Sequence, residues 1–413
     1  MKTLRSILWA SAATGSFAAI MVACSSYSSG GGDPKPSGGN STSTGGSGGG
    51  SCVFKEEAGT VPSFEGIPLP CEVIARDPGG AKCVTAHSTV RVIVPGYSGP
   101  LYQLCKGGSS PGPSSCKGTP MDIQSKDGYA DVEAHEAFCG TDPCTITKIY
   151  DQSGKGNDLE PSPKGGAKPT PNNPAKANAL PVKINGHKAY GILIKAGIGY
   201  RTGCNECNIK KGNGMAVGDE PQSMYMITSV HDTIDGCCFD YGNAETTSND
   251  DGNGTMEAIY FGGGVVWGTG YGGKPGPWVM ADLENGVYAG WENGQDKNIS
   301  TNKPCKTDFV TAVVLGYPTK EYCNGKGRFA LFGGDATTGE LELKYDGIRP
   351  EKPGYAPMTK QGSLILGTGG DNSSGGGGRF YEGAVATGPV ISRSTVAFLQ
   401  AAIVAAKYET YKE

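Results

Sequence analysis

The sequence predicts an all-β fold in which short antiparallel strands form a sandwich or a barrel, followed by a C-terminal helix. Two observations favour strands. The chain has 68 glycines in 413 residues, which suits turns and bulges and opposes long helices. Short runs of β-branched and aromatic residues also recur between clusters of Gly, Pro, Asn and Asp. A third observation predicts the helix, because Val396, Leu399, Ile403 and Lys407 follow one another at helical spacing.

The strand-like runs predict at least six strands, and together they favour a sandwich or barrel. In chain order they are residues 90–94, 145–150, 223–228, 258–261, 309–315 and 363–367. The C-terminal helix is expected over residues 394–408, and a second helix near residues 123–138. No internal repeat is visible, and we expect one domain over residues 52–413.

The N-terminus has the pattern of a lipoprotein export signal. Lys2 and Arg5 precede an apolar stretch, and small residues lead into Cys24. We therefore expect a signal peptide over residues 1–23 and a lipid on Cys24. An ordinary signal peptide with a chance cysteine is the alternative. Residues 24–51 then form a Gly/Ser-rich linker, so the domain is expected at an outer membrane or cell surface, or secreted.

Charge and cysteine content restrict the partners and the compartment. The formal net charge of −4 gives no reason to expect nucleic acid as a partner. Fourteen cysteines indicate an oxidising compartment, or else metal binding. In an exported chain with only four histidines, a local Cys204–Cys207 disulfide is favoured over a redox or zinc site. No metal and no cofactor is expected.

The stretch Trp278–Trp291 carries the most informative pattern. Asn285-Gly286 between two apolar runs predicts a hairpin with strands over residues 279–284 and 287–291. Alternate side chains share a face of a strand, so Asp282 and Glu284 should point the same way. Two such carboxyls repel, which raises one pKa. The alternative is a solvated polar face, but Trp267, Trp278 and Trp291 flank the pair, and aromatic rings beside carboxylates suit a sugar site.

Two further stretches are candidates for the same site. Cys237 and Cys238 are adjacent, and they form a strained ring if they bond to each other; otherwise each pairs elsewhere. The run Leu366-Gly-Thr-Gly-Gly-Asp371 takes an apolar strand into a glycine-rich turn that carries one acid. Such a turn brings backbone amides close to a ligand, or is an ordinary surface loop. The acidic run at residues 249–254 does not have calcium-loop spacing and is expected to be a solvated turn.

From about residue 70 to its end, the chain resembles the fungal-type α-L-arabinofuranosidases of glycoside hydrolase family 54. Ten segments carry the resemblance in order: Ala86–Thr89, Leu101–Leu104, Ile149–Gly154, Ile184–Gly191, Cys237–Thr246, Met256–Tyr260, Gly276–Asn285, Gly367–Ser373, Phe380–Gly383 and Ile403–Tyr408. The resemblance implies a two-sheet jelly-roll sandwich of the concanavalin A type. It also implies removal of terminal α-L-arabinofuranosyl groups from arabinoxylan or arabinan with retention of configuration.

The family's site residues map onto single positions of this chain. The resemblance implies that Glu284 is the nucleophile and that Asp371 is the general acid/base. It places sugar contacts at Trp267, Asp282, Asn285, Gly370 and Asn372, and a pocket disulfide at Cys237–Cys238. Two more disulfides fall on Cys71–Cys83 and Cys139–Cys144. Because Asp371 must hold a proton before it can give one to the leaving oxygen, we expect a raised pKa there.

The chain also departs from the family pattern. It has further cysteines, whose local pairing we expect as Cys105–Cys116, Cys204–Cys207 and Cys305–Cys323, with Cys52 left over. Fungal members carry an additional C-terminal arabinose-binding domain, and we expect the membrane tether to replace it.

Two rival functions remain open: a cell-surface lectin on the same fold, and a related glycosidase such as a β-xylosidase or galactofuranosidase. The expected partners are arabinose-containing polysaccharides or oligosaccharides and a membrane, and the expected state is a monomer.

Overall fold

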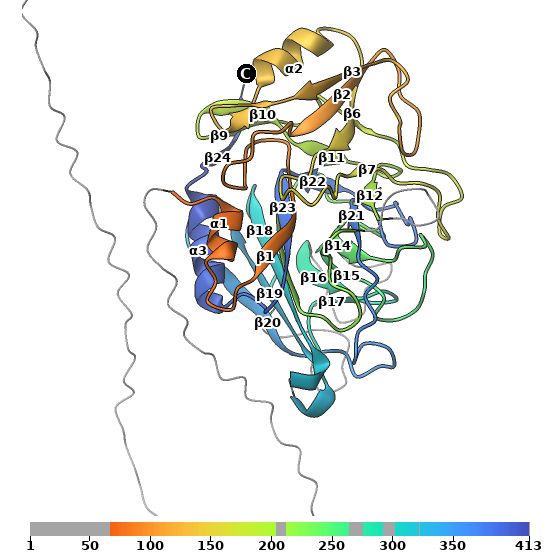
Figure 1. Cartoon of the computed structure of the whole chain (residues 1–413), viewed down its shortest axis with the longest axis vertical. Coiled ribbons are helices and arrows are strands. Elements are labelled where there is room, and N and C mark those ends of the chain that lie inside the picture. Colours follow the sequence, from red (N-terminus) through yellow and green to blue (C-terminus); the bar gives the residue numbers. More distant parts are fainter. Residues whose placement is uncertain (1–66, 204–211, 264–275, 292–301, 322, 413) are drawn as a thin grey trace, which may run out of the picture. The chain divides into compact units, whose positions relative to one another are not determined.

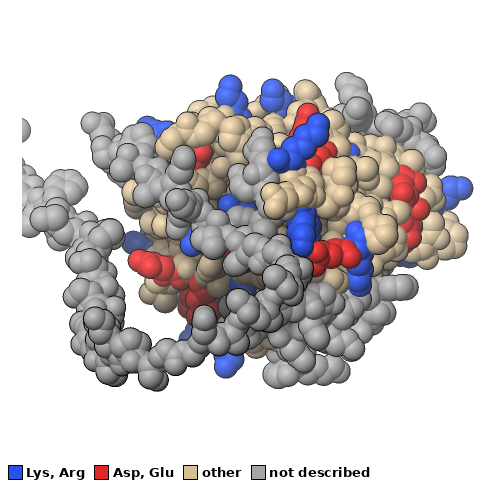
Figure 2. All heavy atoms as spheres, turned by 90° about the horizontal axis from the view of Figure 1, so that it is seen from below, with Lys and Arg blue, Asp and Glu red and all other residues tan. Residues whose placement is uncertain are grey.

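A computed structural model describes residues 67–203, 212–263, 276–291, 302–321 and 323–412 (Figure 1). The expected signal peptide, the lipid site at Cys24, the linker, Cys52, Cys204, Cys207 and Trp267 all lie outside these ranges. None of the helices in the described ranges has the length and apolar character needed to cross a bilayer. On the face shown in Figure 2, acidic and basic side chains are interspersed.

The first of two large sheets has six strands, and every neighbouring pair is antiparallel. The order across this sheet is β1-β23-β13-β18-β19-β20. Their bounds are β1 Lys82–Ser88, β23 Glu382–Thr387, β13 Gln222–Thr228, β18 Val310–Tyr317, β19 Arg328–Asp335 and β20 Glu342–Ile348. Neighbours in the sheet are often distant in sequence, so the sheet joins both ends of the domain.

The second large sheet has seven strands in the order β17-β16-β15-β14-β21-β12-β7, again antiparallel. Their bounds are β17 Val287–Tyr288, β16 Trp278–Asp282, β15 Glu257–Gly262, β14 Asp240–Ala244, β21 Ser363–Leu366, β12 Tyr200–Thr202 and β7 Glu160–Pro161. This sheet carries the candidate site.

The two large sheets pack face to face around one apolar core, as a β-sandwich does. Strand β16 shows how alternation divides its residues. Val279 and Ala281 enter the core between the sheets, whereas Met280 belongs to a separate cluster on the opposite face. Asp282 lies on that opposite face as well, so the sheet has one side for stability and one for the site.

The outer face of the six-stranded sheet is covered by two helices, α1 (Pro70–Ala75) and α3 (Arg393–Val404), which lie side by side in Figure 1. Leu399 and Ile403 of α3 form a second apolar cluster with Tyr225 and Val313 of that sheet. The predicted C-terminal helix is therefore confirmed, and its apolar stripe faces the sheet.

Smaller sheets and helix α2 (Val132–Cys139) lie at one end of the sandwich, the upper end in Figure 1. Their strands are β2 Tyr102–Lys106, β3 Thr119–Ile123, β4 Ser125–Lys126, β5 Tyr129–Ala130, β6 Cys144–Ile149, β8 Ala175–Lys176, β9 Pro181–Ile184, β10 His187–Tyr190, β11 Ile192–Ile194, β22 Gly378–Phe380 and β24 Tyr408–Thr410. Two short 3₁₀ turns, η2 Thr319–Glu321 and η3 Cys323–Gly325, follow β18.

Five of the six predicted strands are confirmed, as β6, β13, β15, β18 and β21. The strand expected at residues 90–94 is wrong, because only Arg91 forms an isolated bridge, to Tyr129. The helix expected from residue 123 is wrong in its first half. Asp127 and Gly128, with φ of 55° and 85°, form the turn of the β4–β5 hairpin there. Helix α2 begins only after Asp131, whose carboxylate caps Ala134 N.

The predicted end of the C-terminal helix is also wrong. The helix stops at Val404, and Lys407 has a φ of 52°, which turns the chain into β24. Tyr408, expected in the last turn of the helix, therefore pairs with Ile184 of β9.

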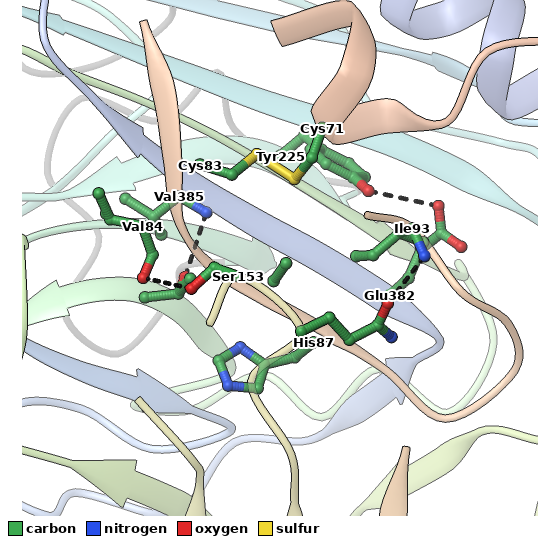
Figure 3. Close-up of a disulfide and its surroundings, with 12 residues drawn as sticks. Cys71, Cys83, Val84, His87, Ile93, Ser153, Tyr225, Glu382 and Val385 are labelled. Atoms are coloured by element: carbon green, nitrogen blue, oxygen red, sulfur yellow. Dashed lines mark hydrogen bonds between the residues drawn. A yellow bond between two sulfur atoms is a disulfide. The ribbon is translucent and has the colours of Figure 1, made fainter. Parts of the chain in front are cut away.

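Three of the expected disulfides outside the pocket join neighbouring segments of the chain. Cys71–Cys83 ties α1 to β1, as Figure 3 shows, and Cys139–Cys144 and Cys105–Cys116 also form. In the same view Tyr225 donates a hydrogen bond to Glu382, so a buried polar contact lies close to the disulfide. The Cys305–Cys323 pair is wrong. Cys305 is a free cysteine, and it is buried in the core between the sheets.

Candidate active site

A pocket of about 360 Å³ opens on the outer face of the seven-stranded sheet, where several loops meet. The hairpin after β16 forms one wall, and the turn after β21 forms another. The adjacent cysteines before β14 lie between them. Its lining residues are Ala167, Cys237, Cys238, Asp250, Met256, Asp282, Glu284, Asn285, Gly286, Val287, Gly369, Gly370, Asp371 and Ser373. Both expected catalytic acids line this one pocket.

The hairpin turn holds Glu284 in an unusual backbone conformation. The predicted hairpin forms, but its turn is centred one residue earlier than expected. Glu284 and Asn285 have φ of 62° and 54°, and Leu283 N donates to Gly286 O. Two central residues of positive φ are what a tight primed turn requires. Strand β16 therefore ends at Asp282, and Glu284 enters the pocket from the turn rather than from the strand.

Backbone contacts fix this turn from several sides. Glu284 N donates to Oδ1 of Asp282 at 3.1 Å, and the hydroxyl of Tyr355 donates to Glu284 O at 2.7 Å. Gly254 N donates to Leu283 O at 2.8 Å, which joins the acidic loop to the hairpin. The Glu284 side chain is only 8% exposed. The carboxyl is therefore held in place before any ligand arrives.

The second acid sits in a tight turn that its own carboxylate helps to form. Oδ1 of Asp371 accepts a hydrogen bond from Ser373 N at 2.9 Å, and Gly369 N donates to Ser373 O at 2.8 Å. Gly370 and Ser373 line the pocket on either side of Asp371.

Asn372, expected as a sugar contact, does not line the pocket. Its side chain is fully buried, and its Oδ1 accepts from Asn172 Nδ2 at 2.8 Å. Its Nδ2 donates to Lys168 O and Thr170 O at 3.4 and 3.3 Å. These bonds tie the turn of Asp371 to the neighbouring loop. The structure thus gives Asn372 a place behind the acid, and Ser373 faces the pocket instead.

Cys237 and Cys238 are bonded to each other, and their disulfide lies between the two acid-bearing turns. Sγ of Cys237 is 3.2 Å from Ser373 Oγ, and Sγ of Cys238 is 3.5 Å from Asp282 Oδ2. Trp278, Tyr260 and Met280 form an apolar cluster with Cys238. The pair and Asp282 also have ligand atoms within 4.8 Å of one another, but two sulfurs in a disulfide are not thiolate ligands.

The described tryptophans do not line the pocket, so they do not support a sugar site built on their rings. Trp278 and Trp291 are each only 5% exposed, and neither lines the pocket. Trp278 packs beneath the disulfide, whereas Trp291 lies in the core between the sheets with Tyr288. Clustering in the sequence was misleading because strand alternation and the hairpin send the two rings to opposite faces. Trp267 is outside the described residues.

Four charged residues near the pocket were missed from the sequence. Asp240 is the first residue of β14 and Glu245 directly follows the strand, both within the quoted Cys237–Thr246 run. Alternation along that strand could have placed Asp240 beside the site. Arg201 of β12 carried no recognisable signal. Asp250 belongs to the acidic run that was expected to be a solvated turn, but it lines the pocket and accepts from Asn285 Nδ2 at 2.9 Å.

Arg201 is a fully buried cation beneath the site. One of its terminal nitrogens donates to Glu245 O at 2.9 Å and to Gly370 O at 2.6 Å, and the other donates to the Ser248 hydroxyl. Burial lowers the pKa of Arg201 to about 10, although Glu245, Asp371 and Glu284 oppose this shift. One guanidinium therefore offsets several carboxyls and, through Gly370 O, braces the turn of Asp371.

The buried carboxyls hold protons more tightly than free ones. Burial, with the nearby charges of Glu245 and Asp282, raises the pKa of Glu284. Burial and the Asp282 charge raise the pKa of Asp240 well above its usual value. Burial raises the pKa of Asp282 to about 7, against the Glu284 N–H bond that lowers it. Burial likewise raises the pKa of Glu245, although its interaction with Glu284 lowers it.

Known proteins match both the sequence and the fold. Residues 70–409 match the family described as "Alpha-L-arabinofuranosidase B, catalytic". A probable α-L-arabinofuranosidase B of Aspergillus terreus is 45% identical over 343 residues, which are 82% of this chain and 62% of the relative. A Trichoderma koningii protein named arabinofuranosidase/β-xylosidase is also 45% identical, over 82% of this chain and 63% of its own length.

Solved structures of this group share the fold. An arabinofuranosidase in complex with arabinofuranosyl-α-1,2-xylobiose has a TM-score of 0.73 and 40% identity, over 83% of this chain and 66% of that one. A mutant of a GH54 α-L-arabinofuranosidase soaked with 4-nitrophenyl α-L-arabinofuranoside has a TM-score of 0.71 over the same shares. The chain spans about three-fifths of the length of the curated relatives it matches. Because the family match covers most of the chain, the protein belongs to the α-L-arabinofuranosidase B catalytic family, glycoside hydrolase family 54.

Proposed function

We propose that the protein is a retaining α-L-arabinofuranosidase that removes terminal α-L-arabinofuranosyl groups from arabinoxylan or arabinan. The observation that carries the proposal is the pairing of Glu284 and Asp371, two carboxyls that enter one pocket from two braced turns. Retaining glycosidases use two such acids. The names of the relatives and the arabinoside complex of a family structure support the same sugar.

In the proposed first step, Glu284 attacks the anomeric carbon while Asp371 gives its proton to the leaving oxygen. A covalent arabinosyl–Glu284 ester forms, and the glycosidic bond breaks. In the second step Asp371 takes a proton from water, and that water releases the sugar and restores the Glu284 carboxylate. Asp282, Asn285 and Gly370 contact the sugar, and Trp267 is a further proposed contact. The Cys237–Cys238 disulfide serves as an apolar floor for the furanose ring.

The test is hydrolysis of 4-nitrophenyl α-L-arabinofuranoside and of an arabinosylated xylo-oligosaccharide by the purified protein. Glu284→Gln should lower kcat by more than about 10³-fold on both, because no covalent intermediate can form. Asp371→Asn should lower kcat by about 10²–10⁴-fold on the oligosaccharide. Its effect on the first step of the nitrophenyl substrate should be smaller, because nitrophenolate leaves without a proton.

Glu342→Gln on β20 is the control, since this residue lies on the other large sheet and away from the pocket. Proton NMR of the first product should show the α-anomer, which distinguishes retention from inversion. A folded wild-type protein that binds arabinosides but cleaves neither substrate would instead support the lectin function.

A β-xylosidase side activity is a second candidate, favoured by the name of the Trichoderma koningii relative. Hydrolysis of 4-nitrophenyl β-D-xyloside should then depend on the same two acids. If xyloside cleavage persists in Glu284→Gln, it belongs to a contaminant or to another site.

We also propose that the protein works outside the cytoplasm, held to a membrane by a lipid on Cys24. Four disulfides among the described residues support an oxidising compartment. When cells that export the protein are fed a fatty-acid analogue, the wild-type protein should carry the label. The Cys24→Ser variant should be unlabelled and released from the membrane. Release of the wild-type protein without label would favour simple secretion.

A further inference from the structure

Lys168 is a half-buried cation near the pocket that the proposed mechanism does not use. It lies in the loop between β7 and β8, directly after Ala167, which lines the pocket. Its Nζ donates hydrogen bonds to Oδ1 of Asn172 at 2.8 Å and to Oγ of Ser374 at 3.2 Å. Oγ of Ser374 donates to the same oxygen of Asn172 at 2.8 Å. Ser374 belongs to the loop after β21, so the ammonium joins that loop to its own.

The ammonium fixes the orientation of the amide group of Asn172. A lysine ammonium donates hydrogen bonds and accepts none, so it has to face the oxygen of this amide and not its nitrogen. Nδ2 of Asn172 therefore points the other way, and it donates to Oδ1 of Asn372 at 2.8 Å. Both asparagine side chains are fully buried, so neither amide can satisfy its polar groups with bulk water instead.

The amide group of Asn372 is fixed in turn. Because its Oδ1 accepts from Asn172, its Nδ2 faces the carbonyl oxygens of Lys168 and Thr170, to which it donates at 3.4 and 3.3 Å. Turning over either amide would set donor against donor or acceptor against acceptor at a buried contact, which is unfavourable. One lysine therefore determines the direction of a chain of hydrogen bonds that ends beside Asp371.

The same loop also holds Asp371 directly. Ala167 N donates to Asp371 O at 3.0 Å. The two segments are so close that a side chain in place of Gly165 would collide with Asp371 O and with Cβ of Asn372. Oδ1 of Asp371 accepts from Ser373 N, and within the described residues its Oδ2 accepts no hydrogen bond. Oδ2 is therefore free for a substrate, and the backbone of this turn decides where it points.

We propose that Lys168 is a positioning residue for the general acid/base, and that it acts through Asn172 and Asn372 to hold the turn of Asp371. This inference rests on the proposed function, since it assigns a support to the proposed acid. Lys168 does not line the pocket, so it neither contacts the sugar nor transfers a proton. Proton transfer to the leaving oxygen needs hydrogen-bond reach, and a misplacement of about 1 Å costs about a hundredfold in rate.

The dependence on the leaving group tests the proposal. Lys168→Met keeps most of the length of the side chain and removes the donor that orients Asn172. Its kcat/KM, which reports the first chemical step, should fall by about ten- to a hundredfold on an arabinosylated xylo-oligosaccharide. On 4-nitrophenyl α-L-arabinofuranoside it should change by less than about threefold, because nitrophenolate leaves without a proton. Lys168→Arg keeps the charge and the donors, so it should restore most of the lost kcat/KM.

Lys164→Met is the matched control. Lys164 lies in the same loop and carries the same charge, but its side chain is exposed and it does not line the pocket. Its replacement should leave kcat/KM on both substrates within about twofold of wild type. If Lys164→Met reproduces the selective loss, the effect comes from the charge of the loop, and the proposal fails.

A double variant shows whether Lys168 acts through Asp371. In an Asp371→Asn background no carboxylic acid remains to be misplaced, so adding Lys168→Met should change kcat/KM on the oligosaccharide by less than about twofold. A merely structural role would lower kcat/KM by the same factor in both backgrounds. That result, an equal loss on both substrates, or wild-type kinetics in Lys168→Met would each overturn the proposal.

Amide hydrogen exchange separates the failure of this proposal from the failure of the proposed function. Gly369 N and Asn372 N donate to Ser373 O and Gly369 O within the turn, and in Lys168→Met they should exchange about tenfold faster or more. If the wild type cleaves neither substrate but this difference appears, the function fails and the support of the turn stands. If these amides exchange at the wild-type rate, the support is refuted even in an active enzyme.

Discussion

Glu284 has a backbone conformation that usually belongs to glycine or asparagine. A left-handed φ at a residue with a long side chain is unfavourable by about 1–2 kcal/mol. Such strain persists only where neighbouring contacts over-determine it, and it gathers at functional sites. Here Tyr355 and Gly254 bind the carbonyls of Glu284 and Leu283. These hydrogen bonds therefore offset the backbone strain at Glu284, and its carboxyl is held facing the pocket.

The raised pKa of Asp282 predicts a pH-dependent stability. The ordinary value is 3.8 and the folded value about 7, so the folded state binds a proton more tightly than the unfolded state. This contribution is full below pH 4 and is lost as the pH rises through 7. Asp282→Asn should remove the dependence and stabilise the protein at pH 8 relative to wild type, by up to about 4 kcal/mol.

Denaturant unfolding at pH 4.5 and 8, with disulfides intact, measures this difference. Asn keeps an oxygen that can accept from Glu284 N, so the turn should survive. The expectation would be contradicted if the free energies of unfolding of wild type and variant differed by the same amount at both pH values.

The pocket disulfide predicts a binding defect rather than a folding defect. Replacing Cys237 and Cys238 together by alanine removes the surface between Asp282 and Ser373. We expect KM for the nitrophenyl arabinoside to rise by about tenfold or more, as the loss of about 1.4 kcal/mol of sugar contact requires. The matched control is Cys105→Ala with Cys116→Ala, a disulfide outside the pocket. A similar KM in both double variants would rule out a contact role.

At the scale of elements, the sequence predicted most strands but not the exact turns that make the site. Alternation on β16 correctly places Asp282 with Met280 on the site face, because period two is a local property. The turn centre was missed by one residue, since Asn285 at positive φ suits either position of a primed turn. Asn372 was misplaced because its burial depends on Asn172, about 200 residues away in the chain.

Elements far from the pocket should affect stability without affecting catalysis. Leu399 of α3 packs against the outer face of the six-stranded sheet, on the other side of the sandwich from the site. Leu399→Ala should lower the free energy of unfolding by about 2–5 kcal/mol, because a fully buried side chain leaves a cavity. KM and kcat at 25 °C should remain those of the wild type. A change in KM of the remaining folded protein would show that α3 communicates with the pocket.

At the scale of the whole molecule, one buried ion cluster joins the two large sheets. Glu257 of β15 contacts Arg349 at 2.7 Å and Lys360 at 3.3 Å, and it accepts from Gln222 of β13 at 2.9 Å. Arg349, Lys360 and Glu257 side chains are all fully buried. The cluster lies between the sheets and away from the pocket, so its role is in stability.

Glu257→Gln should destabilise the protein by about 3–5 kcal/mol, because two buried cations lose their partner. Burial raises the pKa of Glu257, but Arg349 and Lys360 overcome this and lower it to about 2. The folded pKa is below the ordinary 4.5, so this stability is present above pH 4.5 and is lost as the pH falls towards 2. Acid unfolding of wild type and variant should therefore converge. A variant as stable as wild type at pH 7 would contradict the assignment.

The charges that line the pocket have a consequence for inhibitors. Four acidic residues line it: Asp250, Asp282, Glu284 and Asp371. No lysine or arginine of the described ranges lines it, and the nearby Arg201 is fully buried. A five-membered iminosugar with the hydroxyls of arabinofuranose carries an ammonium group in place of the ring oxygen. It should bind more tightly than the neutral sugar, and its advantage should grow with pH until the amine itself loses its proton.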